Sequence, residues 1–116
     1  MKIITKPMWE VLVPTIHGHS NNPVRLKHHR IWDDKVREIS GGLTINSPSK
    51  GQWISPDGKL FVERVIPVRI MATEEEINQI IDFTLTHYHQ EAVMFYKITD
   101  ECFVKYAQEK KCSSSD

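Results

Sequence analysis

The order of helical and extended segments constrains the fold of this chain most. Residues 24–40 and the segment that follows Thr73 space their apolar residues as helices do, and strand-forming segments precede, separate and follow them. The order β, α, β, β, α, β predicts an α+β, ferredoxin-like split βαβ sandwich, in which two helices cover one face of an antiparallel sheet. We expect a single domain over residues 1–116, with a core over about residues 8–107 and a flexible tail over residues 108–116.

Both helices carry end signals. Thr73, followed three residues later by Glu76, predicts a capping box at the start of the second helix. Gly41-Gly42 predicts the end of the first helix, because glycine adopts the left-handed conformation without a Cβ penalty. The expected core stripe of the second helix consists of Ile77, Ile80, Ile81, Leu85 and Tyr88.

The extended segments predict six strands. The first four are expected at residues 8–13, 43–45, 51–54 and 60–71. Pro56-Asp57-Gly58 predicts a hairpin turn between the last two of these. Pro67 has no N–H to donate, so it predicts an edge or a bulge. Residues 92–98 and 102–107 predict two final strands, joined by a polar turn at residues 99–101.

Charge and cysteine content exclude several classes of function. Fifteen Lys and Arg balance fifteen Asp and Glu, so no net positive field favours nucleic acid or an acidic membrane as a partner. Cys102 and Cys112 form no disulfide framework, and no apolar run predicts a signal peptide or a membrane span. We therefore expect a cytoplasmic protein without a cofactor. The phosphate-binding and hydrolase motifs of common enzymes are also absent from the sequence.

Histidines form the most conspicuous polar cluster of the sequence. His17 and His19 share a face if their loop is extended, so both could bind one transition metal if a third ligand, such as His29, came from the first helix. Histidines in a polar loop are also common without a metal, and we expect none here. His87 and His89 are expected to face solvent or to interact with the carbonyl end of the second helix.

A carboxylate and a tryptophan flank the predicted hairpin turn. With the turn centred near residues 57 and 58, Trp53 falls opposite residue 62 or 63, so Trp53 and Glu63 should lie close together and border the main cleft. Glu63 would then bind a ligand together with a basic partner such as Arg69 or Lys50. In the alternative interpretation, Trp53 only caps the sheet and Glu63 is solvated.

Short motifs over roughly residues 8–107 resemble a bacterial domain family of uncharacterised function and, more distantly, the phage S-adenosylmethionine lyases. The motifs shared with the bacterial family are Gly41-Gly42-Leu43-Thr44-Ile45, Gly51-Gln52-Trp53, Pro56-Asp57-Gly58, Glu63 and Gln90-Glu91-Ala92-Val93. The likeness to the lyases rests on a first strand like Trp9 to Val13, His29-Arg30 in a helix, Gly51 to Trp53, Glu63, and Val93 to Lys97.

This resemblance implies a ferredoxin-like subunit of the PII signalling-protein type, usually a homotrimer with small-molecule sites in the clefts between subunits. We therefore expect a nucleotide-like or anionic ligand, with Trp53, Glu63, Lys50 and Arg69 as the candidate ligand-binding residues. Alternatively, the chain resembles a lyase that converts S-adenosylmethionine into methylthioadenosine and homoserine lactone, with Glu63 as the catalytic carboxylate. The lyases have a tyrosine at the position of Trp53, and an indole N–H donates a hydrogen bond but accepts none.

Overall fold

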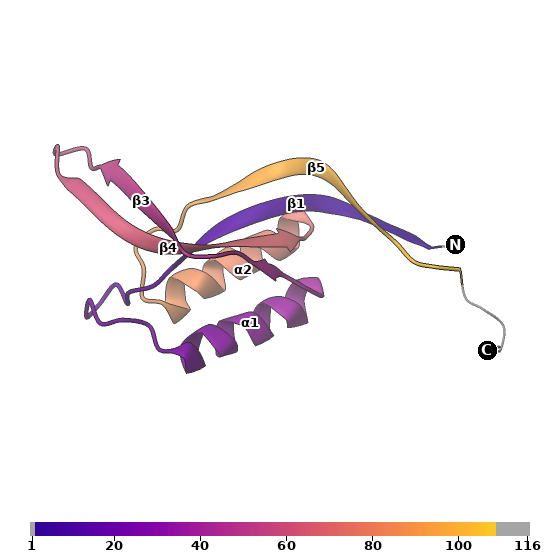
Figure 1. Ribbon diagram of the computed structural model, residues 1–116, viewed down its shortest axis with the longest axis horizontal. Helices are drawn as coiled ribbons and strands as arrows, with labels where there is room; N and C mark the ends of the chain where they lie inside the picture. The colour runs from indigo at the N-terminus through magenta and orange to yellow at the C-terminus, as the bar shows by residue number, and fades with distance from the viewer. Residues whose placement is uncertain (1, 109–116) are drawn as a thin grey trace.

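The computed structural model describes residues 2–108, and the helices and strands follow the predicted order. The elements are β1 (Ile3–Pro14), α1 (Leu26–Ser40), β2 (Thr44–Ile45), β3 (Ser49–Ile54), β4 (Leu60–Met71), α2 (Glu74–His87) and β5 (Phe95–Lys105). The strands form one antiparallel sheet in the order β2-β4-β1-β5, and β3 also pairs with β4. Both helices cover the same face of this sheet, as Figure 1 shows. The predicted ferredoxin-like α+β fold is confirmed.

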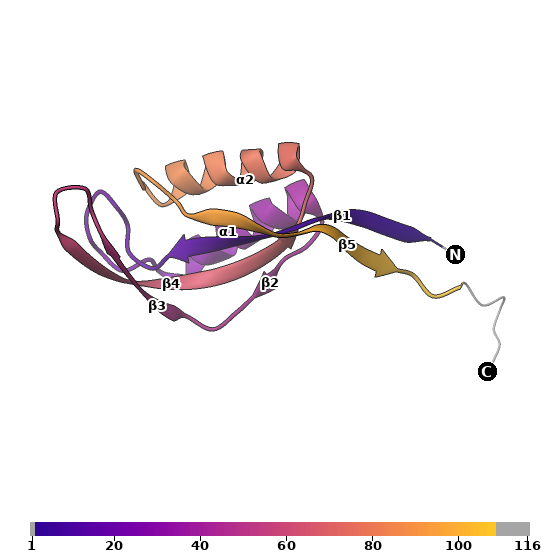
Figure 2. The same cartoon turned by 90° about the horizontal axis from the view of Figure 1, so that it is seen from above.

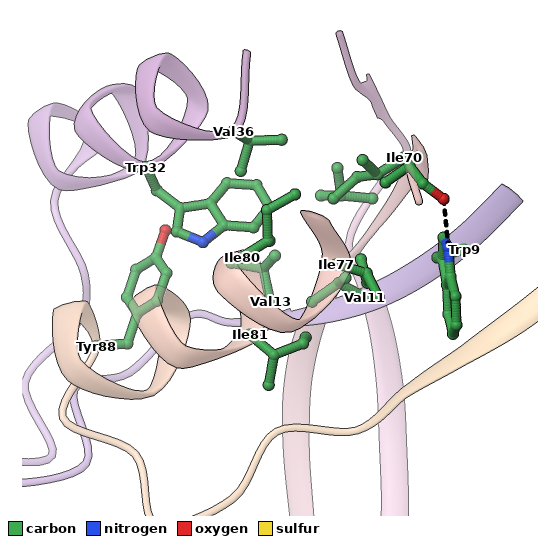
Figure 3. Close-up of a cluster of buried hydrophobic side chains, with 12 residues drawn as sticks. Trp9, Val11, Val13, Trp32, Val36, Ile70, Ile77, Ile80, Ile81 and Tyr88 are labelled. Atoms are coloured by element: carbon green, nitrogen blue, oxygen red, sulfur yellow. Dashed lines mark hydrogen bonds between the residues drawn. The ribbon is translucent and has the colours of Figure 1, made fainter. Parts of the chain in front are cut away.

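The core lies between the two helices and the sheet (Figure 3). Alternate residues of β1 and β4 point toward the helices, because successive side chains of a strand point to opposite faces. The buried apolar residues are Trp9, Val11, Val13, Trp32, Val36, Val68, Ile70, Ala72, Ile77, Ile80, Ile81 and Tyr88. Of the stripe predicted for α2, only Leu85 is partly rather than fully buried.

The helix caps and the hairpin turn predicted from the sequence are present in the structure. Thr73 and Glu76 form both hydrogen bonds of the capping box. Gly41 ends α1 with a φ of 96°, and its N–H donates to the carbonyl of Arg37. In the hairpin turn, Gly58 has a φ of 85° and its N–H donates to the carbonyl of Ser55 at 2.8 Å. Each glycine therefore occupies a backbone conformation that other residues rarely adopt.

Pro67 lies inside the sheet rather than at its edge. The neighbouring strand changes from β2, which pairs with Val68, to β3, which pairs with Val65. Asn46 donates its N–H to the Pro67 carbonyl at 2.9 Å within this irregular stretch. Because the ladder is interrupted on this side of β4, the missing N–H of Pro67 removes no regular strand bond. Of the two predicted alternatives, the structure therefore shows a local irregularity of the ladder rather than an edge strand.

The last two predicted strands are a single strand, β5, and no turn lies at residues 99–101. The register with β1 shifts twice there: Lys6 pairs with Cys102, Met8 with Thr99, and Trp9 with Lys97. The polar residues thus belong to bulges in a continuous strand. The tail predicted for residues 108–116 falls, from residue 109 on, outside the described residues.

The first strand is also longer than predicted, because it begins at Ile3 rather than at residue 8. Pro7 lies at one of the two register breaks and has no pairing partner in β4 or β5. Proline therefore does not end the strand here, since no ladder bond is required of it.

At the end of the molecule where β1 begins, β1 and β5 extend beyond the helices, and the β3–β4 hairpin extends at the opposite end (Figure 2). Neither helix is long and apolar enough to cross a membrane.

Candidate functional site

Trp53 and Glu63 are brought together across the β3–β4 hairpin. The indole Nε1 of Trp53 donates a hydrogen bond of 2.8 Å to Oε2 of Glu63. The two residues are diagonal neighbours, because Trp53 pairs directly with Phe61 and Glu63 pairs with Gly51. Gly51 has no side chain, which leaves the carboxylate room to turn toward the indole. The predicted proximity is therefore present, with Trp53 opposite residue 61 rather than 62 or 63.

The surroundings of this pair combine an aromatic surface with charge. The indole of Trp53 stacks on the Phe61 ring, with centroids 4.7 Å apart and planes inclined by 16°. Trp53 remains 47% exposed. A shallow hollow lies beside the pair and is lined by Pro48, Ser49, Lys50, Val62, Glu63 and Arg64. Trp53 does not line this hollow, and the side chains of Lys50 and Arg64 point to the opposite face of the hairpin from Glu63, because successive strand residues alternate between faces.

Of the two basic partners expected for Glu63, the structure places only Lys50 beside it. Lys50 pairs with Arg64 in the register and lines the same hollow as Glu63. Arg69 lies six residues further along β4, a separation of about 20 Å in an extended strand. Arg69 instead binds Glu10, with Nε donating to Oε1 at 3.3 Å. Within one chain, Arg69 is therefore not part of the Trp53–Glu63 site.

Glu10 is a polar centre that sequence reasoning missed. Its residue is only 8% exposed, and it lies on the sheet face away from the helices, since its neighbours Trp9 and Val11 belong to the core. Its carboxylate accepts hydrogen bonds from Arg69 and from the Tyr96 hydroxyl. The hydrogen bond to Glu10, together with burial, raises the pKa of the Tyr96 phenol. The sequence feature that could have indicated this polar centre is the presence of an acidic residue, Glu10, within an apolar strand segment.

Histidines form a second cluster, on the opposite side of the fold from the sheet's uncovered face. His17 and His19, from the loop after β1, lie beside His89, which follows α2. One ring nitrogen of each residue lies within 4.8 Å of the others. His29 is elsewhere: its Nδ1 lies 2.7 Å from the Tyr88 hydroxyl. The structure therefore replaces His29 by His89 as the third histidine of this group.

Burial affects the protonation of two of these histidines. Desolvation lowers the pKa of His17, and the nearby rings of His28 and His19 lower it further. Desolvation also lowers the pKa of His29. Both imidazoles are therefore neutral at pH 7 and retain a lone pair on one ring nitrogen.

Comparison with known proteins finds similarity only at the level of structure. No family model and no curated protein sequence matches the chain. A phage S-adenosylmethionine lyase in complex with S-methyl-5'-thioadenosine has a TM-score of 0.60 at 12% identity, over 89% of this chain and 92% of the lyase. The periplasmic divalent cation tolerance protein CutA from Archaeoglobus fulgidus has a TM-score of 0.55 at 11% identity, over 93% of this chain and 89% of CutA.

A third similar structure is the divalent cation tolerance protein from Thermus thermophilus, with a TM-score of 0.53 at 8% identity, over 93% of this chain and 89% of that protein. At identities this low, the similarity shows a common fold but does not show a common activity. The chain therefore shares the ferredoxin-like α+β fold of the phage lyase and of the divalent cation tolerance proteins.

Proposed function

We propose that this chain assembles as a homotrimer of the PII type and binds a small nucleotide-like or anionic ligand in the clefts between subunits. The observation that carries this proposal is the number of large apolar side chains that remain exposed on the strands. They are Trp53, Ile54, Leu60, Phe61 and Val62 on the β3–β4 hairpin and Tyr96, Ile98, Phe103 and Val104 on β5. Because successive residues of a strand point to opposite faces, these side chains lie on both faces of the strands. We call these nine residues the apolar strand surface. Exposed apolar side chains in such number are typical of an interaction site.

The sheet edges support a cyclic assembly. One edge of the sheet is β5, and the other is formed by β2 and β3. Unpaired strand edges bind other strands readily, and two different edges of one chain make a head-to-tail contact that can close into a ring. The strands extend beyond the helices at both ends of the molecule, where a neighbouring copy can reach them (Figure 2). The resemblance to PII-type proteins favours three copies.

The Trp53–Glu63 pair suits a flat ligand that carries a polar edge. The exposed indole of Trp53 offers apolar area to a ring, and Glu63 accepts a hydrogen bond from an amino group. Lys50 and Arg64 line the adjacent hollow and can neutralise a phosphate or carboxylate. Arg69 would contribute to the same cleft only from another subunit, because it lies far along β4.

A ligand screen followed by one substitution tests this assignment. Nucleotides and S-adenosylmethionine should include a compound that raises the unfolding temperature, because a ligand that binds only the folded state stabilises it by mass action. Glu63→Gln should abolish the ligand-dependent shift, and Glu91→Gln, which changes an exposed carboxylate away from the hairpin, should retain it. An unchanged shift in Glu63→Gln, with the assembly intact, would contradict the site.

A second candidate function is S-adenosylmethionine lysis. It is favoured by the match to the phage lyase structure and by the hydrogen bond between Trp53 and Glu63, because Glu63 is a shared motif residue and Trp53 stands where the lyases have a tyrosine. In this reaction the substrate's own carboxylate attacks the γ-carbon of its methionine part. The bond between that carbon and sulfur breaks, and homoserine lactone and methylthioadenosine form. The protein would supply positioning and electrostatic stabilisation.

Product analysis separates the two functions. Chromatography after incubation with S-adenosylmethionine should show both products from an active lyase and neither from Glu63→Gln. Trp53→Tyr, which introduces the lyase residue, is the informative second variant. If neither the wild type nor Trp53→Tyr forms products, the lyase function is excluded, and the ligand-binding function is judged by the screen alone.

A further inference from the structure

We propose that His17, His19 and His89 form a binding site for one first-row transition-metal ion, of which Zn²⁺ is the representative. All three residues belong to one chain, so the site depends neither on the proposed trimer nor on the ligand of the Trp53–Glu63 pair. No acidic residue belongs to the group of three. The protein ligands of the ion would therefore be imidazole nitrogens only, and these determine which metals the site binds.

The three rings lie close enough to bind a common ion after small rotations. Their candidate ligand atoms lie within 4.8 Å of one another, and the rings of His19 and His89 are 3.8 Å apart between centroids. Tetrahedral zinc with Zn–N distances of about 2.0–2.1 Å requires ligand nitrogens about 3.3 Å apart. His19 and His89 are exposed, so rotation of their side chains can close this gap without moving the core.

Hydrogen bonds hold the two contributing segments together. The backbone N–H of Gly18 donates to the Tyr88 carbonyl at 3.1 Å, and the side-chain Nε2 of Gln90 donates to the Ile16 carbonyl at 2.9 Å. The loop approaches so closely that a Cβ on Gly18 would lie 1.9 Å from the carbonyl oxygen of His89. Glycine is therefore required between His17 and His19 for this geometry.

His17 also has a ring nitrogen that forms no hydrogen bond within the described residues. This atom, Nδ1, is buried. A buried polar atom without a partner is destabilising, and metal binding by the imidazole is one way to compensate for it. The His17 ring contacts the rings of both His19 and His89, with centroids 5.8 and 5.9 Å away.

The ligand set selects the class of metal. Neutral imidazoles suit zinc, copper, nickel and cobalt, whereas Mg²⁺ and Ca²⁺ require oxygen ligands. Three protein nitrogens leave the fourth position of a tetrahedral ion open to water or to another small donor. The ion would join the loop after β1 to the segment after α2, two parts of the chain separated by about seventy residues.

Titration calorimetry with Zn²⁺ on tag-free protein, purified without chelators, tests the site. We expect one equivalent per chain and no heat from Mg²⁺. His19→Gln and His89→Gln should each weaken Zn²⁺ binding by about 100-fold or more, since even residues that only support metal ligands contribute 10- to 100-fold. His29→Gln is the matched control, because His29 binds Tyr88 instead of joining the group, and it should bind Zn²⁺ as the wild type does.

Gly18→Ala tests the scaffold without removing a ligand, and it should also weaken Zn²⁺ binding. Thermal unfolding of each variant confirms that the fold is retained. Absence of Zn²⁺ binding by the wild type, or equal Zn²⁺ affinity in His89→Gln and the wild type, would overturn the proposal. Either result would leave the proposed assembly and its ligand untouched, since neither uses these histidines.

Discussion

At the scale of single residues, a hydroxyl links the two helices inside the core. The indole Nε1 of Trp32 donates to Oγ1 of Thr84 at 2.8 Å, and the same hydroxyl donates to the Ile80 carbonyl at 2.6 Å. Trp32 and Thr84 are both buried, as Figure 3 shows for the tryptophan. A polar threonine is therefore present in the core because it satisfies the only polar atom of the Trp32 side chain.

Thr84→Val should lower the free energy of unfolding by about 1–3 kcal/mol, because it leaves the buried indole N–H without an acceptor while preserving side-chain volume. Chemical denaturation measures this loss. Thr84→Ser retains the hydroxyl and should lose less. If the serine variant were the less stable of the two, packing of the methyl group rather than the hydrogen bond would be the dominant contribution of Thr84.

The half-buried His29 makes stability depend on pH. Its Nδ1 lies 2.7 Å from the Tyr88 hydroxyl, which stays protonated because burial raises the pKa of that phenol. Desolvation lowers the pKa of His29, and the nearby ring of His87 lowers it further. The unfolded chain, in which His29 has an ordinary pKa of about 6.5, then binds more protons than the folded chain.

Stability should therefore fall as the pH drops below about 6.5, and this loss is measured by unfolding at a series of pH values. The His29→Gln variant lacks the ionisable imidazole at this position. Its free energy of unfolding should therefore decrease less between pH 7 and pH 5 than that of the wild type. Some decrease should remain, because the pKa of His17 is lowered as well. An identical pH profile in His29→Gln and the wild type would refute the contribution of His29.

Residue-scale prediction succeeded where contacts are local in sequence. The Trp53–Glu63 pair could be predicted because a short turn determines which residues of a hairpin are neighbours. Glu10 and its partner Arg69 were missed because their contact depends on the pairing of two strands far apart in the sequence. For the same reason His89, which joins His17 only through the docking of a loop, was not predicted as the third histidine.

At the scale of elements, the capping box determines where α2 begins. Thr73→Ala should lower the free energy of unfolding by about 1 kcal/mol, because it removes the acceptor for the Glu76 N–H. Thr86→Ala is the matched control in the same helix, since its exposed hydroxyl only contacts the Asp82 carbonyl at 3.3 Å. Denaturation curves should separate the two variants, and equal losses would argue against the cap.

Element boundaries were predicted correctly where a residue has a local conformational preference and incorrectly where tertiary pairing decides. Gly41, Gly58 and Thr73 stand where the predictions place them. The first strand was predicted to begin only at residue 8 and a turn was predicted at residues 99–101, yet Pro7 and residues 99–101 lie within long strands. The pairing of β1 with β5 continues past these residues because the register shifts there. At the shifts, Pro7, which lacks an N–H, and the polar residues of β5 need no regular partner.

At the scale of the whole molecule, the distribution of apolar residues is asymmetric. One face of the sheet is covered by α1 and α2 (Figure 1). Large apolar side chains remain exposed on β3, β4 and β5. A chain of 116 residues buries a limited core, and covering such a surface is a further source of stability. The sequence predicts the fold through its element order, but the open surface is visible only once the strands are paired.

Sedimentation equilibrium at micromolar concentration tests the proposed assembly most directly. We predict a species with three times the 13.5 kDa mass of one chain. Phe103→Asp, which places a charge on the apolar strand surface, should shift this species toward the monomer while the chain stays folded. A single 13.5 kDa species of the wild-type chain at micromolar concentration would contradict the trimer and, with it, the ligand sites between subunits.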